Sequence, residues 1–87
     1  MPRYLEIRQK ELLELEDAVE KENFEQIRML GHKLKGTGAA YGFEELSRLG
    51  MLIEDKAVAK DIIDVPQFTS EVRHFLEHLE IEYVEME

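Results

Sequence analysis

The segment of residues 31–43 holds the side chains best suited to chemistry, since it combines one histidine, two lysines and four glycines. An imidazole is a good nucleophile at neutral pH, because much of it carries no proton there. If His32 accepts a phosphoryl group, the ammonium of Lys35 can stabilise the phosphoryl oxygens. The chemistry that these residue types suggest is therefore phosphoryl transfer through a histidine.

Gly36, directly after Lys35, indicates that another protein approaches this histidine. Glycine inside a helix costs roughly 0.5–1 kcal/mol relative to alanine. On a solvent-facing surface beside His32, Gly36 gains no packing in return. Because an in-line transfer needs the donor's active site to close over the histidine, we interpret Gly36 as clearance for a partner, with Ala39 and Ala40 as further small residues.

One helix has to position these residues. At about 100° per residue, seven apolar or small residues fall within about 60° of one line. They are Phe24, Ile27, Leu30, Gly31, Leu34, Gly38 and Tyr41. This stripe predicts a helix that continues past Lys35 to Tyr41. Gly31 and Gly38 lie on the stripe and would allow a neighbouring helix to approach closely. Basic residues followed by glycine are also typical of a helix end, so a helix that stops near Gly36 is the alternative.

The continuous helix predicts where the reactive residues face. His32 lies about 140° from the centre of the stripe and should face solvent. Arg28 precedes it by one turn, and Lys35, Gly36 and Ala39 follow it on the same surface. Lys35 projects nearer the edge of the stripe, so its stem can lie along the protein while its ammonium reaches toward His32.

Three further amphipathic helices are predicted by the spacing of apolar residues. The first covers roughly Arg3–Lys21, another runs from Phe43 to about Lys60, and the last runs from about Val65 to Val84. The connections are short, so consecutive helices should be antiparallel. We therefore expect an all-α, antiparallel four-helix bundle of up-down-up-down order, formed by residues 1–87 as one domain.

Capping signals and aromatic residues define these helices more closely. Asn23 pairs with Gln26 at the start of the second helix, and Asp64 pairs with Gln67 at the start of the fourth. Aromatic residues on the apolar stripes are expected in the core; they are Phe24, Tyr41, Phe43, Phe68, Phe75 and Tyr83. Residues 80–87 are acidic, and we expect them to fray.

Composition argues against several classes of function. The net charge of −9 and the pI of about 4.8 make nucleic acid a poor partner. The absence of cysteine excludes disulfides and cysteine-based zinc sites. No segment has 18 continuous apolar residues, and the N-terminus lacks the apolar core of a signal peptide. We therefore expect no membrane partner, a cytoplasmic location and a monomer, and the initiating Met1 and the acidic end favour a protein that stands alone.

The central segment resembles the motif of histidine-containing phosphotransfer (HPt) domains of two-component phosphorelays. That motif is a reactive histidine, a lysine three residues later, a glycine next to the lysine, and a second glycine that opens the following helix. These positions correspond to His32, Lys35, Gly36 and Gly42. The similarity extends over residues 23–54, and the flanking helices agree in number and length.

The resemblance implies a bundle whose exposed His32 carries a phosphoryl group, on Nε2 by analogy, to and from the aspartate of a response-regulator receiver domain. It implies that Lys35 is the cation that stabilises the phosphoryl group and that Gly36 leaves room for the receiver's loops. It also implies that Gly42 allows the tight turn into the next helix. The implied partners are a receiver domain, a hybrid histidine kinase, or both. We add Arg28 and Ala39 as partner-docking residues because they share the face of His32.

The sequence contains no nucleotide site, so the implied role is that of a carrier and not of a kinase, and we expect no cofactor. Gly31 and Gly36 have the glycine spacing of a phosphate-binding loop, but the lysine expected after the second glycine is missing and no strand precedes the segment. The alternative function is a helical adaptor that binds a signalling partner without carrying phosphate. Lys35 beside His32 argues against it, because an adaptor does not require that pair.

Two other constellations have simpler interpretations. His74 and His78 match the H-x-x-E-H spacing of one group of zinc peptidases. We expect no metal there, because the third ligand is unidentified and the chain is too small for a peptidase cleft. Paired carboxylates lie on amphipathic helices, and we interpret them as solvated faces. These pairs are Glu16-Asp17, Glu44-Glu45 and Glu54-Asp55.

Overall fold

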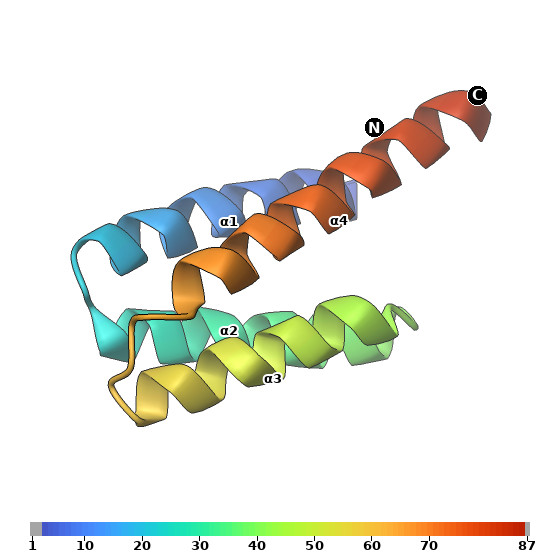
Figure 1. Ribbon diagram of the computed structural model, residues 1–87. Helices are drawn as coiled ribbons and strands as arrows, with labels where there is room; N and C mark the ends of the chain where they lie inside the picture. Colours follow the sequence, from blue (N-terminus) through green and yellow to red (C-terminus); the bar gives the residue numbers. More distant parts are fainter. Residues whose placement is uncertain (1–2, 87) are drawn as a thin grey trace.

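The computed structural model describes the backbone of residues 3–86 and the side chains of residues 6–79. Four helices make up this part of the chain: α1 (Arg3–Glu20), α2 (Phe24–Ala40), α3 (Glu44–Val58) and α4 (Val65–Met86). They run up-down-up-down, with α1 beside α4 in one layer and α2 beside α3 in the other (Figure 1). No strand occurs among residues 3–86. The predicted all-α antiparallel bundle is confirmed.

An apolar core lies between the two layers, because each helix buries one stripe of side chains. The core residues are Leu12, Leu15, Ala18, Ile27, Leu30, Leu34, Leu46, Leu49, Ile53, Ala57, Val65, Val72, Leu76 and Leu79. Four of the aromatic residues predicted on the stripes are partly buried and pack against this core: Phe24, Phe43, Phe68 and Phe75. The apolar stripes of the sequence therefore mark the interior correctly for these residues.

The predicted burial of Tyr41 is wrong. Tyr41 is 60% exposed, because α2 ends at Ala40 and Tyr41 is the C-cap residue, whose backbone no longer follows the helix. Its ring stacks on Phe43, with 6.4 Å between ring centroids and an interplanar angle of 12°. The predicted burial of Tyr83 concerns a side chain outside the described residues. The expected fraying of residues 80–87 concerns the backbone, which is helical to the end of α4 at Met86.

The start and the length of α2 follow the sequence pattern. The side chain of Asn23 accepts a hydrogen bond from the backbone N–H of Gln26 at 3.3 Å, and its amide group donates to the Gln26 side chain at 3.4 Å. The predicted cap is confirmed. The helix continues past Gly36 to Ala40, so the alternative of a helix that stops near Gly36 is wrong.

The start of α4 differs from the predicted cap. The carboxylate of Asp64 forms an ion pair with Nζ of Lys56 at 3.3 Å, and Asp61 forms another at 3.5 Å. The hydrogen bond from Lys56 to Asp64 and the negative charges of both carboxylates raise the pKa of Lys56. The backbone carbonyl of Asp64 accepts a hydrogen bond from the N–H of Phe68 at 3.2 Å. Through Lys56, Asp64 therefore holds the α3–α4 connection against the end of α3.

The backbones of α2 and α3 touch at Gly31, Gly38 and Gly50, and we call this the glycine contact. A Cβ added to Gly31 would lie 2.9 Å from the backbone N of Glu54, and one added to Gly38 would lie 2.6 Å from the backbone N of Ser47. A Cβ on Gly50 would lie 2.7 Å from the carbonyl O of Gly31. Backbone atoms cannot rotate away from an added methyl group, so the approach depends on glycine.

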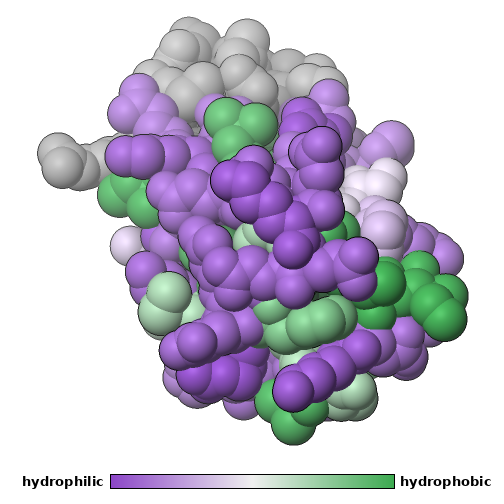
Figure 2. Space-filling view, turned by 90° about the vertical axis from the view of Figure 1, so that its left-hand side faces the viewer, coloured by the Kyte–Doolittle hydropathy of each residue, from purple (hydrophilic) through white to green (hydrophobic). Residues whose placement is uncertain are grey.

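The end of the bundle that carries the α1–α2 and α3–α4 connections is mostly hydrophilic, with separate hydrophobic patches (Figure 2). Within the layer of α1 and α4, Arg73 of α4 donates hydrogen bonds to the carboxylate of Glu16 in α1 at 2.5 and 3.2 Å. These hydrogen bonds raise the pKa of Arg73. None of the helices in the described part of the chain has the length and apolar character needed to span a bilayer.

Candidate functional site

His32 lies on the exposed face of α2, and its side chain is 65% exposed. Its Nδ1 lies 3.0 Å from Oε2 of Glu54, which belongs to α3. An ionised carboxylate only accepts hydrogen bonds, so this contact selects the ring form that carries the proton on Nδ1. Nε2 is then the ring nitrogen with a free electron pair.

Glu54 joins the histidine to the lysine. Its second oxygen, Oε1, lies 3.4 Å from Nζ of Lys35, and its side chain is only 18% exposed. The interpretation of Glu54 as part of a solvated face is therefore wrong. Lys35 and His32 thus contact the same carboxylate, and the side chain of Lys35 is 41% exposed.

The geometry of α2 and α3 explains why these side chains meet. His32 and Lys35 are three residues apart in α2 and so share a face. Glu54 follows Gly50 by one turn in α3, and Gly50 lies against the backbone of Gly31 and Lys35. The glycine contact thus brings α3 near enough for one glutamate to reach two residues of α2.

The three predicted docking residues, Arg28, Gly36 and Ala39, occupy exposed positions near His32. A Cβ added to Gly36 would meet no atom within 4 Å. Gly36 therefore leaves open space next to the imidazole. At the glycines of the glycine contact, by comparison, backbone atoms of the neighbouring helix occupy the space that a side chain would need. Arg28 lies one turn before His32 and adds a positive charge to this face.

A depression between α2 and α3, which we call the α2–α3 hollow, includes Lys35 in its lining and has a volume of about 520 Å³. Its lining residues are Lys35, Gly38, Ala39, Gly42, Glu44, Ser47, Arg48 and Met51. Ser47 Oγ donates a hydrogen bond to the carbonyl O of Lys35 at 3.0 Å. The guanidinium of Arg48 donates hydrogen bonds to the carboxylate of Glu45, which lowers the pKa of Glu45 and raises that of Arg48.

Gly42 ends α2 and turns the chain into α3. Its φ of 78° lies in the left-handed region, which glycine adopts without strain. The N–H of Gly42 donates to the carbonyl O of Ala39 at 3.2 Å, and the N–H of Phe43 donates to that of Gly38 at 2.7 Å. This Schellman ending fixes the tight connection at one end of the α2–α3 hollow.

Comparison with protein families adds a second kind of observation to this geometry. The family model described as "Hpt domain" matches residues 3–82, which is nearly the whole chain. The chain belongs to the Hpt domain family. Comparisons with curated proteins and with solved structures give no match.

Hpt domains are histidine carriers of phosphorelays and are carriers rather than kinases. They interact with the kinases and receivers of two-component systems. In this Hpt domain, Glu54 is the site residue that sequence reasoning missed. It lies at the end of the stretch that resembles the family, and that position was the one signal in the sequence that could have indicated it.

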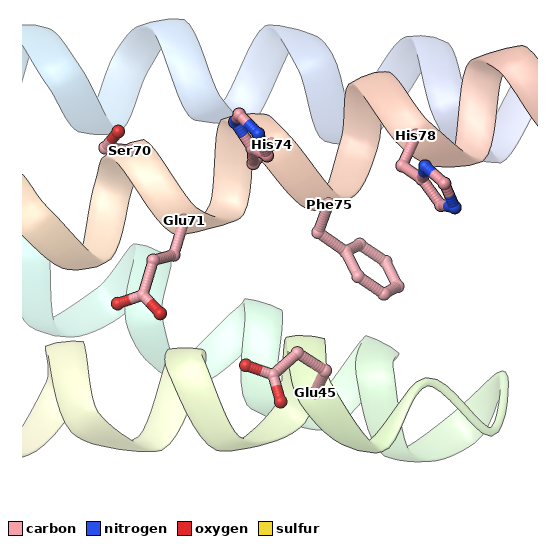
Figure 3. A pocket seen from close by; sticks show the side chains of 6 residues that line it. All are labelled: Glu45, Ser70, Glu71, His74, Phe75 and His78. Atoms are coloured by element: carbon pink, nitrogen blue, oxygen red, sulfur yellow. The ribbon is translucent and has the colours of Figure 1, made fainter.

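The other two histidines of this Hpt domain lie on α4, beside a second depression of about 410 Å³ between α3 and α4. Its lining residues are Glu45, Ser70, Glu71, His74, Phe75 and His78 (Figure 3). Figure 3 shows that the rings of His74 and His78 do not converge on one point. Within the described side chains, no group of three or more histidine, aspartate or glutamate residues could hold a metal ion.

Proposed function

We propose that His32 accepts a phosphoryl group on Nε2 from the aspartyl phosphate of a receiver domain and passes it on to such an aspartate. The observation that carries this proposal is the 3.0 Å contact between the Glu54 carboxylate and Nδ1 of an exposed imidazole. This contact holds the ring in the form whose Nε2 electron pair is free to attack. Membership of the Hpt family supports the same role.

In the transfer, one bond forms and one bond breaks. The Nε2 electron pair of His32 attacks phosphorus to form an N–P bond, and the P–O bond to the receiver's aspartate breaks, so the aspartate leaves as a carboxylate. The ring keeps its proton on Nδ1 and becomes cationic, and the carboxylate of Glu54 stabilises this charge. The reverse step restores the neutral ring and the aspartyl phosphate.

Lys35 supplies a cation for the transferred group. Its ammonium shares Glu54 with His32 and is half exposed, so it can turn from the carboxylate toward phosphoryl oxygens that arrive at Nε2. A phosphoryl group in transfer spreads negative charge over its outer oxygens. An ammonium at this position therefore stabilises the phosphoryl group during the transfer.

Gly36 and the α2–α3 hollow supply the surface on which a receiver docks. Gly36 offers bare backbone next to the imidazole, and the hollow continues this surface along α3. Lys35 and Arg48 lie at the hollow, each paired with a glutamate, and Arg28 lies on the far side of His32, so three cations flank the site although the chain carries a net charge of −9. This local charge complements the aspartate of a receiver.

The test is phosphoryl transfer from a panel of radiolabelled receiver domains to the full chain. Acid-labile, base-stable label should appear on the wild type and be lost in His32→Gln. The double variant His74→Gln/His78→Gln is the matched control, and it should be labelled like the wild type. Label retained in His32→Gln would contradict the proposal. Receiver binding that is unchanged in His32→Ala, with no label on the wild type, would favour the adaptor function.

A further inference from the structure

Gly50 lies where the glycine contact meets the proposed phosphorelay site. A Cβ on Gly50 would lie 2.7 Å from the carbonyl O of Gly31 and 2.9 Å from the carbonyl carbon of Leu34, and still closer to the backbone N of Lys35. Gly31 precedes His32, and Leu34 precedes Lys35. Gly50 therefore rests on the part of the α2 backbone that carries both reactive side chains.

The close approach matters because Glu54 serves two partners at once. Its two oxygens lie 3.0 Å from Nδ1 of His32 and 3.4 Å from Nζ of Lys35. Ordinary van der Waals contact begins at about 3.4 Å, so an alanine at position 50 forces the two backbones apart by at least about 0.7 Å. Glu54 moves with α3, and its carboxylate then no longer reaches both groups.

Gly38 provides a comparison, because it makes a similar contact away from these side chains. A Cβ on Gly38 would lie 2.6 Å from the backbone N of Ser47 and 3.1 Å from the carbonyl O of Phe43. Both residues lie near the start of α3; Ser47 is about two turns from Glu54 and Phe43 about three turns. Substitution of Gly38 therefore disturbs the same pair of helices at the other end of the contact.

We propose that Gly50 is a positioning residue for the phosphorelay site: its contact with α2 sets the helix separation at which Glu54 holds Nδ1 of His32 while it pairs with Lys35. The consequence for transfer rests on the proposed function, since Glu54 matters there by keeping Nε2 nucleophilic. A displacement of about 1 Å can lower a reaction rate about a hundredfold. We expect Gly50→Ala to accept phosphate roughly ten- to a hundredfold more slowly than the wild type.

The position of the ring proton on His32 reports the Glu54 contact without any phosphoryl transfer. Proton–nitrogen correlation spectra of the nitrogen-labelled full chain, at a pH of about 9 where an ordinary imidazole is neutral, distinguish the two ring forms. His32→Gln assigns the ring signals, and Glu54→Ala gives the signals of the ring without its carboxylate.

The wild type should carry the proton on Nδ1, and Gly50→Ala should move its ring signals at least half-way to those of Glu54→Ala. Gly38→Ala should keep ring signals close to the wild type. A cooperative thermal transition establishes that each variant is folded. If Gly50→Ala does not fold, Gly31→Ala takes its place, because its Cβ would meet the backbone N of Glu54 at 2.9 Å and so causes a milder displacement at the same contact.

Three results would overturn the inference. The first is a folded Gly50→Ala variant, or its Gly31→Ala substitute, with the ring signals of the wild type. The second is an equal shift in Gly38→Ala, which would assign the effect to general loosening of the two helices. The third is a wild-type ring with its proton on Nε2.

Failure of the proposed function would give a different pattern of results. If no receiver labels the wild type while the ring signals behave as expected, the relay role fails and the positioning role of Gly50 stands. If His32 of the wild type is labelled and Gly50→Ala keeps the wild-type ring signals, the relay role stands and the positioning role fails.

Discussion

The carboxylate of Glu54 determines what the imidazole of His32 can do. An exposed histidine alone exchanges its proton between two ring nitrogens, and either nitrogen can act as a nucleophile. The contact at 3.0 Å to Nδ1 assigns the proton to one nitrogen and the electron pair to the other. The ion pair of the same carboxylate with Lys35 keeps Glu54 oriented toward α2.

Glu54→Ala should lower the rate of transfer from a receiver to His32 by about ten- to a hundredfold, because the ring loses the group that fixes its proton and stabilises its charge. Glu54→Gln should lie between this variant and the wild type, since an amide oxygen still accepts a hydrogen bond from Nδ1 but carries no charge. Single-turnover transfer kinetics measure both rates, and a thermal melt confirms that each variant is folded. Equal rates in all three proteins would contradict the role of Glu54.

The residues of the site differ in how well the sequence predicts them. The exposure of His32 and the open space at Gly36 follow from the rotation of one helix, which periodicity determines. The role of Glu54 does not follow, because it depends on the separation of two helices. That separation is set by backbone atoms at Gly50, and no spacing within α3 marks Gly50 as different from an ordinary interior position.

At the scale of the element, α2 contains interior glycines in two opposite environments. A Cβ on Gly36 would point into open space, whereas a Cβ on Gly38 would lie 2.6 Å from the backbone N of Ser47. The same substitution should therefore have opposite effects at two positions two residues apart.

Gly36→Ala should raise the free energy of unfolding by about 0.5–1 kcal/mol, because alanine restricts the unfolded chain and favours helix. Gly38→Ala should lower it by about 1–3 kcal/mol, because the added methyl group overpacks the glycine contact. Chemical denaturation of the two variants and the wild type measures both changes. A loss of stability in Gly36→Ala would mean that this position is not open.

The ends of the elements were harder to predict than their faces. The apolar stripe correctly predicts a helix that continues past Gly36, but it also includes Tyr41, which is exposed. A wheel assumes helical geometry to its last residue, and Tyr41 comes after the last helical residue. Gly42 ends the helix there, because its left-handed φ of 78° starts the turn into α3.

At the scale of the whole molecule, the order of four helices places the site on one helix pair and leaves the other pair to complete the core. The fold was predictable because the stripes, short connections and caps all indicate an antiparallel bundle. The surface on α2 and α3 combines open backbone at Gly36 with positive charge at Lys35 and Arg48, in a chain of net charge −9. This combination is what a docking surface for an acidic partner requires.

Gly36→Gln should prevent receiver docking, because its side chain would occupy the open space beside the imidazole. Transfer from a phosphorylated receiver should fall at least about tenfold, whereas a small phosphodonor such as phosphoramidate should still label His32 at the wild-type rate. Receiver binding by calorimetry and labelling by both donors separate the two effects. An unchanged rate with the receiver would show that the partner does not approach over Gly36.

The most direct measurement for the account as a whole is the position of the phosphoryl group on the wild-type chain after transfer from a phosphorylated receiver. Phosphorus and nitrogen NMR of the labelled chain should place it on Nε2 of His32, with the proton still on Nδ1 beside Glu54. A phosphoryl group on Nδ1 of His32, on His74 or His78, or on no histidine at all would contradict the account.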